Sequence, residues 1–194
     1  MPQQLDGRYE ILKPLGTGGF GKTYLARDLR IPGTPYCVVK QLHCVSQKSD
    51  DKQLARELFQ REAESLAKLG HHNQIPRLLA YFTENDEFYL VEDFIDGRSL
   101  EDEINPGQPW PEAAVMQLMK DVLEVLAFVH QQGVIHRDIK PGNLIRRHSD
   151  GKIVLIDFGA IKQIEQVSPQ HTGCLLYTSP SPRDLSTSRM PSSA

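Results

Sequence analysis

The chain has 194 residues, of which 39% are hydrophobic and 24% are charged, and its formal net charge is −3 at pH 7. This composition supplies enough apolar residues for a folded core. The mildly acidic balance gives no electrostatic basis for binding nucleic acid or an anionic membrane surface. No stretch approaches eighteen consecutive apolar residues, so we expect no membrane segment.

The cysteines indicate the redox environment. There are three, and they stand at positions 37, 44 and 174 without the spacing of metal ligands. An odd number of cysteines in such an arrangement predicts reduced thiols in the cytoplasm and argues against a zinc site.

The first half of the chain is expected to be rich in strands. Short apolar runs between Gly and Pro residues predict strands at 9–15, 22–28, 36–42, 77–83 and 88–94. Between the third and fourth strands, apolar residues at helical spacing predict a helix that ends at Gly70 and begins near residue 51. These elements predict a small antiparallel sheet with one helix packed on it.

The second half begins with another helical pattern. Apolar residues recur at helical spacing over 111–132, at Val115, Leu118, Met119, Val122, Leu126 and Val129. We expect this helix to be part of the core. Strand-like segments follow at 143–147 and 152–157.

Three glycines stand where the first strand meets the second. Gly16, Gly18 and Gly21 form the pattern G-x-G-x-x-G within LGTGGFGKTYLA. Glycines allow backbone amides to approach phosphate oxygens without interference from a side chain. A dinucleotide-binding fingerprint would open a helix, whereas a strand follows here, so the pattern favours the phosphate-covering loop of a protein kinase.

Lys40 ends the apolar run of the third strand, at the interval after the glycine loop that the lysine of a kinase V-A-I-K strand occupies. A carboxylate on the first helix is its expected partner. Glu62 is preferred because it stands four residues before Leu66, as in the kinase helix that this one resembles, and Glu57 and Glu64 remain alternatives. Such an ion pair would direct the ammonium at two phosphates.

The stretch VIHRDIKPGNLI contains the pattern H-R-D-x-x-x-x-N. Asp138 can accept a proton from an attacking hydroxyl or orient it, and Lys140 can neutralise charge on a transferring phosphoryl group. Asn143 can offer a neutral oxygen to Mg²⁺. A polar loop between a helix and a strand would not explain why all these residues coincide. His136 is expected to pack and orient its neighbours rather than to act as a general base.

The last strand-like segment ends at Asp157, and Phe158 and Gly159 follow it. A carboxylate at the end of a buried strand can hold Mg²⁺ between the β- and γ-phosphates, because hard cations prefer oxygen ligands. Asn143 and Asp157 are therefore the predicted metal ligands.

Together with HHNQIPRLLAYF, these motifs resemble the eukaryotic-type protein kinases over roughly residues 9–173, and in particular bacterial Ser/Thr kinases of cyanobacterial type. The resemblance implies an α+β fold with two lobes. Residues 1–95 would form a small antiparallel-sheet N-lobe with one helix, and residues 96–173 would form an incomplete, mainly helical C-lobe.

The same resemblance implies ATP and Mg²⁺ as cofactors and a protein with a Ser or Thr hydroxyl as the acceptor. Lys140, two positions after Asp138, is similar to its counterpart in Ser/Thr-specific members. Arg137 resembles the arginine of kinases that are regulated by phosphorylation of the activation segment. The catalytic group would comprise Lys40, Glu62, Asp138 and Lys140.

The adenine would lie between Thr23 and Val38 on one side and Ile145 on the other. The connection that contains Asp93 and Ile95 would offer backbone hydrogen bonds to it.

Two positions depart from the family pattern. Thr23 replaces the usual valine, and its hydroxyl is not a neutral exchange in an apolar site. Glu92 falls where the family normally has an apolar or neutral residue. It would carry a desolvation cost unless it is paired or protonated.

Residues 174–194 differ from everything before them. Ser, Thr and Pro make up eleven of these 21 residues, a composition typical of a disordered tail. Since CLLYTSPSPRD and SRMPSSA resemble a translated sequencing adapter, our hypothesis is that this tail is not native and that the biological sequence stops near Gly173. A kinase fragment of this length is expected to lack activity and to expose apolar surface on the second helix. Thr172 is a candidate phosphorylation site.

The expected function is therefore that of a Ser/Thr protein kinase that transfers the γ-phosphate of ATP. A nucleotide-binding pseudokinase or scaffold and a small-molecule kinase remain the alternatives. The presence of Lys40, Asp138, Asn143 and Asp157 argues against the first, and the intact glycine loop with Lys140 argues against the second.

Overall fold

The computed structural model describes residues 3–18, 21–42, 49–70, 72–85, 87–159 and 162–163. All of them belong to one compact unit that comprises residues 1–164. The predicted tip of the glycine loop at residues 19–20, Thr172 and the predicted tail at 174–194 lie outside the described residues.

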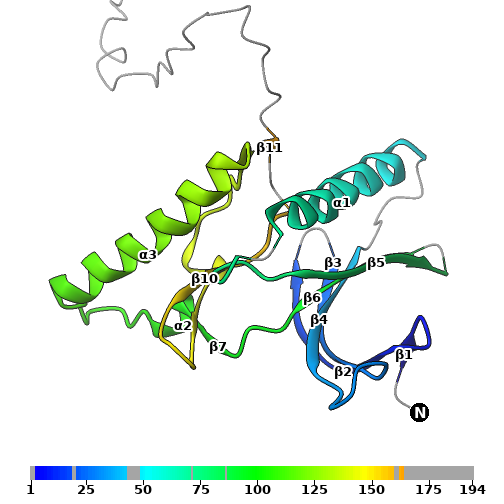
Figure 1. The fold of residues 1–194 in the computed structure, drawn as a ribbon, viewed down its shortest axis with the longest axis horizontal. Helices are drawn as coiled ribbons and strands as arrows, with labels where there is room; N and C mark the ends of the chain where they lie inside the picture. Colours follow the sequence, from blue (N-terminus) through cyan, green and yellow to red (C-terminus); the bar gives the residue numbers. More distant parts are fainter. Residues whose placement is uncertain are drawn as a thin grey trace, which may run out of the picture. The chain divides into compact units, whose positions relative to one another are not determined.

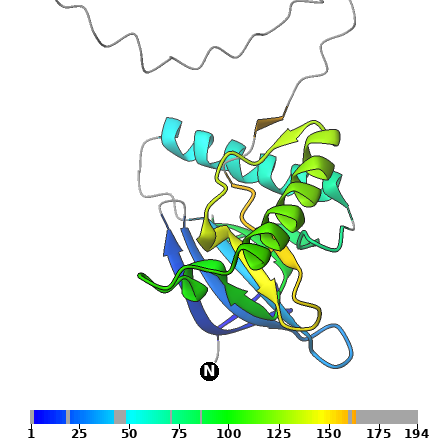
Figure 2. The same ribbon diagram turned by 90° about the vertical axis from the view of Figure 1, so that its left-hand side faces the viewer.

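A six-stranded antiparallel sheet forms the first part of this unit (Figure 1). Its strands, in spatial order, are β1 (Gln4–Leu5), β2 (Tyr9–Gly18), β3 (Gly21–Asp28), β4 (Tyr36–Leu42), β6 (Glu87–Asp93) and β5 (Leu78–Glu84). In Figure 2 the blue strands curl below the cyan helix α1 (Ser49–Leu69). The expected antiparallel sheet with a single helix is confirmed.

The two faces of the sheet have different roles because side chains alternate along each strand. Cys37 and Val39 of β4 are buried in an apolar cluster with Tyr9, Tyr89 and Val91. The alternate residues of β4 and β6 point to the opposite face, toward α1 and the rest of the unit.

Helix α1 packs on β5 and β6 through one apolar face. Phe59, Ala63, Leu66 and Leu69 lie on this face and are buried. The helix ends at Gly70, which has φ +60° and whose N–H donates to the carbonyl oxygen of Leu66 at 3.2 Å. A glycine in this left-handed conformation is a common way to end a helix.

The remaining elements form the second part of the unit. They are β7 (Gly97–Ser99), α2 (Leu100–Glu103), α3 (Glu112–Gln131), β8 (Val134–Ile135), the short 3₁₀ helix η1 (Pro141–Asn143), β9 (Leu144–Arg147), β10 (Ile153–Leu155) and β11 (Lys162–Gln163). Strands β10, β9 and β7 form a three-stranded sheet, and β11 pairs with β8. A core that includes Leu66, Leu90, Val125, Leu155 and Phe158 joins both parts.

The prediction for α3 was wrong in one respect. Val122, Val125 and Val129 are buried where the helix contacts β8 and β10. Val115 and Met119 were expected in the core, yet they are 39% and 48% exposed, because no described element covers this face of the helix. Exposed apolar surface on this helix was also expected, and it is present.

Two strand boundaries also differ from the predictions. Asn143 lies in η1 rather than at the start of a strand, and β10 ends at Leu155. The strand cannot continue to Asp157 because this residue has φ +66°, which is incompatible with an extended backbone. Among the described helices, none is long and apolar enough to cross a membrane.

Candidate active site

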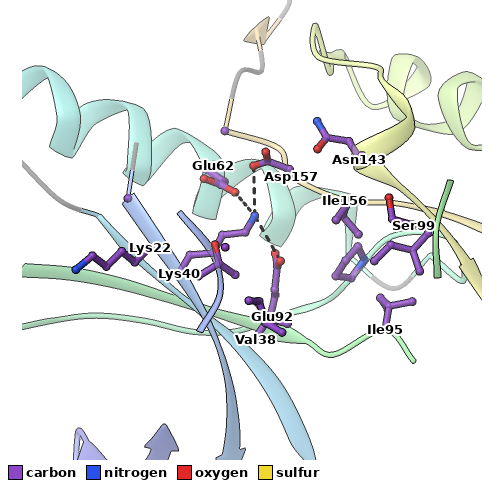
Figure 3. Close-up of a pocket in the computed structure, with 18 of the residues that line it drawn as sticks. Lys22, Val38, Lys40, Glu62, Glu92, Ile95, Ser99, Asn143, Ile156 and Asp157 are labelled. Carbon is purple, nitrogen blue, oxygen red and sulfur yellow. Dashed lines mark hydrogen bonds and ion pairs between the residues drawn. The ribbon is translucent and has the colours of Figure 1, made fainter. Parts of the chain in front are cut away.

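A cleft of about 800 Å³ lies between the large sheet and the second part of the unit (Figure 3). The predicted site residues that line it are Gly16, Gly21, Thr23, Val38, Lys40, Glu62, Asp93, Ile95, Asp138, Lys140, Asn143, Ile145 and Asp157. The structure thus brings together residues from β2, β3, β4, α1, β6 and the segments on either side of β9 and β10.

The glycines at the mouth of the cleft are required for different reasons. Gly21 has φ +154°, and a Cβ atom here would lie 1.9 Å from the carbonyl oxygen of Gln41, so close approach of β3 and β4 excludes a side chain. A Cβ atom on Gly16 would meet nothing within 4 Å. Gly16 therefore leaves open space beside the cleft, where a ligand could approach the backbone. Gly18 pairs with Gly21 at the end of the β2–β3 hairpin.

Lys40 lies at the centre of the cleft, between three carboxylates (Figure 3). Its Nζ atom is 2.9 Å from Oε1 of Glu62, 3.4 Å from Oε1 of Glu92 and 3.5 Å from Oδ1 of Asp157. Burial disfavours the ammonium ion, but the three carboxylates outweigh this effect and raise the pKa of Lys40 above its ordinary value. The lysine is therefore cationic throughout the physiological range.

Glu62 is the carboxylate of α1 that pairs with Lys40. It is buried, and Lys40 donates a hydrogen bond to it. Glu64, an alternative from the sequence, is exposed and accepts a hydrogen bond from Gln60 at 2.8 Å. Glu57, the other alternative, is also exposed.

Glu92 is the most unusual residue in the cleft wall. Its side chain is only 5% exposed, and its Oε2 atom has no hydrogen-bond partner among the described residues. Burial raises its pKa to about 7, although the nearby Lys40 opposes this shift. The desolvation cost expected from the sequence is thus present and only partly offset by the ion pair.

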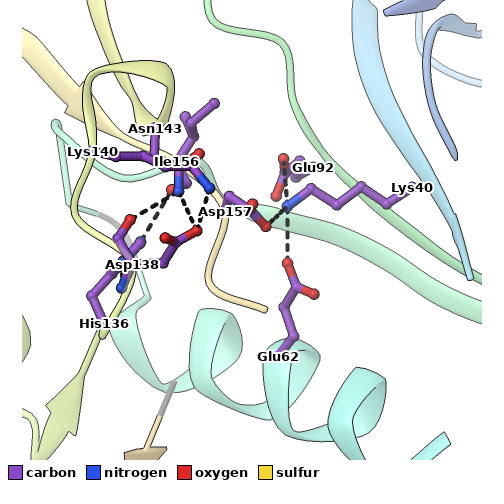
Figure 4. A network of polar contacts seen from close by, with 9 residues as sticks. All are labelled: Lys40, Glu62, Glu92, His136, Asp138, Lys140, Asn143, Ile156 and Asp157. Carbon is purple, nitrogen blue, oxygen red and sulfur yellow. Dashed lines mark hydrogen bonds and ion pairs between the residues drawn. The ribbon is translucent and has the colours of Figure 1, made fainter. Parts of the chain in front are cut away.

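Asp138, Lys140 and Asn143 form one polar network beside the cleft (Figure 4). Nζ of Lys140 donates to Oδ2 of Asp138 at 2.7 Å, and Nδ2 of Asn143 donates to the same oxygen at 2.9 Å. The hydrogen bond from Lys140, followed by that from Asn143, lowers the pKa of Asp138 below its usual value. Asp138 is therefore ionised and able to accept a hydrogen bond from a hydroxyl group.

His136 connects this network to the segment after β10. It is buried, and its Nδ1 atom accepts a hydrogen bond from the backbone N–H of Asp138 at 3.3 Å. Its Nε2 atom must then carry the proton, and it lies 3.1 Å from the carbonyl oxygen of Ile156. The ring packs edge-on against Phe158, with centroids 4.8 Å apart. These contacts agree with the packing and orienting role expected from the sequence.

Two residues of the site adopt left-handed backbone conformations. Arg137 has φ +69° and Asp157 has φ +66°, values that are uncommon for residues other than glycine. Such conformations store strain that the surrounding structure must offset, and they concentrate at functional sites.

Asn143 and Asp157 provide oxygen atoms that fit Mg²⁺. Nδ2 of Asn143 donates to both the carbonyl oxygen and Oδ2 of Asp138, so Oδ1 is its remaining polar atom. The side chain of Asp157 is 47% exposed and lies in the cleft wall. Within the described residues, no group of three His, Cys, Asp or Glu side chains could hold a metal ion. Two protein oxygens nevertheless suit Mg²⁺, which usually keeps several waters and binds substrate phosphates.

The predicted adenine-contacting residues lie on the expected walls of the cleft. Thr23 is opposite Lys40 in the β3–β4 pairing, and Val38 is opposite Glu92 in the β4–β6 pairing. Ile145 comes from β9 on the other side of the cleft, and Ile95 follows β6.

A clamp at the end of β6 was not expected from the sequence. Arg77 donates hydrogen bonds to Asp93 from Nε at 2.6 Å, from an outer guanidinium nitrogen at 2.9 Å and from its backbone N–H at 3.1 Å. The backbone N–H of Asp93 donates in return to the carbonyl oxygen of Arg77 at 3.1 Å. No local pattern in the sequence predicts this clamp, because Arg77 immediately precedes β5 whereas Asp93 is the last residue of β6, 16 positions further along the chain.

Comparisons with known proteins identify the family. A model of the protein kinase domain matches residues 9–188. The chain is 48% identical over 170 residues to serine/threonine-protein kinase B of Synechocystis sp., an alignment that covers 87% of this chain and 30% of the relative. It is 47% identical over 164 residues to serine/threonine-protein kinase PknA of Nostoc sp., covering 84% of this chain and 29% of the relative.

A more distant relative is the probable serine/threonine-protein kinase YbdM of Bacillus subtilis. It is 35% identical over 161 residues, covering 82% of this chain and 60% of the relative. The chain spans only about 30% of the length of the two cyanobacterial relatives. The matched residues include helix α1 and all the residues named above in the cleft, and the chain belongs to the protein kinase family.

Proposed function

We propose that this chain carries the nucleotide site and catalytic loop of a Ser/Thr protein kinase, which transfers the γ-phosphate of ATP to a hydroxyl group of a protein. The observation that supports this most directly is the single cleft lined by Lys40, Asp138, Asn143 and Asp157. Nucleotide binding alone would not require a solvent-accessible carboxylate such as Asp138 in the same cleft as Lys40, whereas phosphoryl transfer uses one to position the acceptor hydroxyl.

Lys40 would bind the phosphates of ATP, and Glu62 would hold its ammonium in place from α1. The adenine would occupy the part of the cleft between Val38 and Ile145, and Gly16 would leave room for the phosphates. Backbone groups of Asp93 and Ile95 would form hydrogen bonds with the adenine.

Asp138 would orient the acceptor hydroxyl and take its proton as the oxygen attacks the γ-phosphorus. The bond from the γ-phosphorus to the bridging oxygen breaks, and ADP leaves. Lys140, 2.7 Å from Asp138, would stabilise the negative charge on the transferring group. Asn143 and Asp157 would hold Mg²⁺, which neutralises charge on the phosphates.

The acceptor and the cellular location follow from other features. Lys140 and the relatives named above favour Ser or Thr rather than Tyr. A protein acceptor, rather than nucleic acid, fits the formal charge of −3. Cys37 is a buried free thiol, which supports a cytoplasmic location.

The test measures two properties, MgATP binding and transfer of radiolabelled γ-phosphate to protein and small-molecule acceptors. Both should be measured for the 194-residue chain and for the complete product of its gene. Asp138→Asn should leave MgATP binding within about twofold and reduce transfer by at least about a hundredfold. Asp150→Asn is the matched control, because Asp150 pairs with Arg147 in the β9–β10 turn and does not line the cleft.

Transfer to a protein hydroxyl that depends on Asp138 supports the proposal. Tight MgATP binding without transfer in either form would instead indicate a nucleotide-binding scaffold. Transfer only to small molecules would indicate a small-molecule kinase.

A further inference from the structure

The buried carboxylate of Glu92 faces Lys40, the lysine proposed to bind the phosphates of ATP. This arrangement gives the cleft a property beyond the reaction proposed above. Glu92 is on β6, next to β4, which carries Lys40. Because Val38 pairs with Glu92 and Lys40 pairs with Leu90, the register places the side chains of Glu92 and Lys40 on the same face of the sheet. Figure 4 shows both of them directed at the same point in the cleft.

The ammonium of Lys40 donates a hydrogen bond to Glu62 and forms ion pairs with Glu92 and Asp157. A lysine ammonium has three N–H donors, and three carboxylates lie within 3.5 Å of Nζ of Lys40. A phosphate oxygen that binds Lys40 therefore enters a space that three carboxylates already surround, and it competes with them for the ammonium. Nucleotide binding at Lys40 is thus a competition between phosphates and protein carboxylates.

The three carboxylates differ in how readily each can move away from Lys40 when a nucleotide binds. Asp157 is 47% exposed and is the residue proposed to turn toward Mg²⁺. Glu62 makes the shortest contact and aligns the ammonium from the helix. Glu92 is enclosed, and its backbone is fixed within the sheet, so its charge stays beside the phosphate position after the nucleotide has entered.

Burial of the Glu92 carboxylate costs free energy, so the need to fill space in the core does not explain why a glutamate stands at this position. Its Oε2 atom is buried without a partner in the described part of the chain, and an apolar side chain of similar volume would avoid this cost. The described charged groups that face it are Lys40, Glu62 and Asp157. Three carboxylates therefore surround one ammonium, and two of them, Glu62 and Glu92, are buried.

We propose that Glu92 is a specificity-determining residue whose buried carboxylate competes with the nucleotide's phosphates for Lys40, and so weakens binding of ATP relative to uncharged adenosine. This inference rests on the proposed function, since it assumes that the phosphates of ATP lie beside Lys40. Repulsion between Glu92 and the phosphates falls with each phosphate that is removed from the ligand. Affinity for the adenosine part of the nucleotide does not depend on it.

The experiment compares the affinities of MgATP, AMP and adenosine by calorimetry for the 194-residue chain at pH 8. Burial raises the pKa of Glu92 to about 7, so its carboxylate is mostly ionised at this pH. Glu92→Gln removes the charge and preserves the shape. It should tighten MgATP binding by about tenfold, AMP binding by less, and adenosine binding by less than about twofold. Glu92→Met, which removes the polar group altogether, should shift affinities in the same order.

Glu124→Gln is the matched control, because it removes one negative charge from an exposed position on α3 and should change no affinity. Equal changes for MgATP and adenosine, or weaker MgATP binding by both Glu92 variants, would overturn the inference while leaving the proposed function intact. Failure of the unsubstituted chain to bind any of the three ligands would contradict the proposed function itself.

Discussion

Asn143 donates hydrogen bonds from one nitrogen, Nδ2, to two atoms of Asp138, the backbone carbonyl oxygen and Oδ2, each at 2.9 Å. These hydrogen bonds therefore fix the distance between the proposed metal ligand and the proposed base, which stand five positions apart in the chain. The orientation of the Asn143 amide is determined by these bonds, since only a nitrogen can donate them.

Replacement of Asn143 by Asp is expected to destabilise the loop. The change removes both donors and places a second carboxylate beside Asp138, and Asn143 is buried, so the loss should be about 2 kcal/mol of unfolding free energy. Urea unfolding at pH 8 measures it. Asn105→Asp, at an exposed position in the turn after α2, is the control and should change stability by less than about 0.5 kcal/mol. Equal effects of the two changes would show that the hydrogen bonds of Asn143 contribute little.

Gly16 and Gly21 of the glycine loop should respond differently to replacement by alanine. Gly21→Ala would place a methyl group 1.9 Å from the carbonyl oxygen of Gln41, so β3 and β4 must separate and stability should fall by about 2 kcal/mol or more. Gly16→Ala meets no atom within 4 Å and should change stability by less than about 0.5 kcal/mol.

MgATP binding should depend on Gly16, although stability does not. Since Gly16 borders the cleft where the phosphates are proposed to lie, Gly16→Ala should weaken MgATP binding by several-fold without changing stability. Thermal unfolding and calorimetry on the same samples provide both measurements. A stable Gly16→Ala variant with unaltered affinity would argue against phosphates at this place.

The clamp between Arg77 and Asp93 should influence nucleotide binding more than stability. The side chain of Arg77 is half-exposed, so loss of the ion pair in Arg77→Ala should cost less than about 1 kcal/mol. The segment that would bind the adenine loses its fixed position, and MgATP affinity should fall by several-fold. Arg147→Ala is the control, because Arg147 forms a comparable pair with Asp150 away from the cleft. Similar affinities for the two variants would assign the clamp a purely structural role.

Glu92 makes stability depend on pH in a defined direction. Its pKa is raised to about 7 in the folded chain, whereas an unfolded glutamate titrates at about 4.3. Between these values the folded state binds a proton that the unfolded state has released, so the contribution of Glu92 to stability falls as pH rises, by at most about 1.4 kcal/mol per pH unit.

The comparison that isolates this effect uses Glu92→Gln. Its unfolding free energy should increase relative to that of the unsubstituted chain between pH 5.5 and pH 7.5, and level off above the folded pKa. Groups remote from Glu92 titrate alike in both proteins, so their contributions cancel in the difference, which reports Glu92 together with the charged groups that it contacts. A difference that stays constant across this range would mean that Glu92 titrates normally in the folded chain.

Short-range patterns predicted the parts of the site that depend on local chemistry. A short apolar run between Gly and Pro residues located β4, and with it Lys40, while the resemblance of the first helix to that of protein kinases selected Glu62 over its neighbours. The sheet with one helix followed from the same kind of pattern, whereas the two-lobed α+β fold was expected from the resemblance to protein kinases. The roles assigned to these residues stay predictions until they are measured.

Features that depend on pairing between distant segments could not be predicted in this way. The clamp of Arg77 on Asp93 and the approach of Glu92 to Lys40 require the register of β5, β6 and β4, which no single segment encodes. Strand β7 and helix α2 are too short for periodicity to reveal them. The exposure of Met119 on α3 depends on which elements cover the helix, and spacing cannot specify that.

The register of β3, β4 and β6 also sets where the chain can accept insertions and deletions. Thr23, Lys40, Val38 and Glu92 face the cleft because of the pairings Thr23–Lys40 and Val38–Glu92. Deletion of one residue inside β4 would turn its side chains to the opposite face, exchanging Lys40 for an apolar neighbour. The exposed turn between β3 and β4, at residues 29–35, has no such constraint and should tolerate added residues.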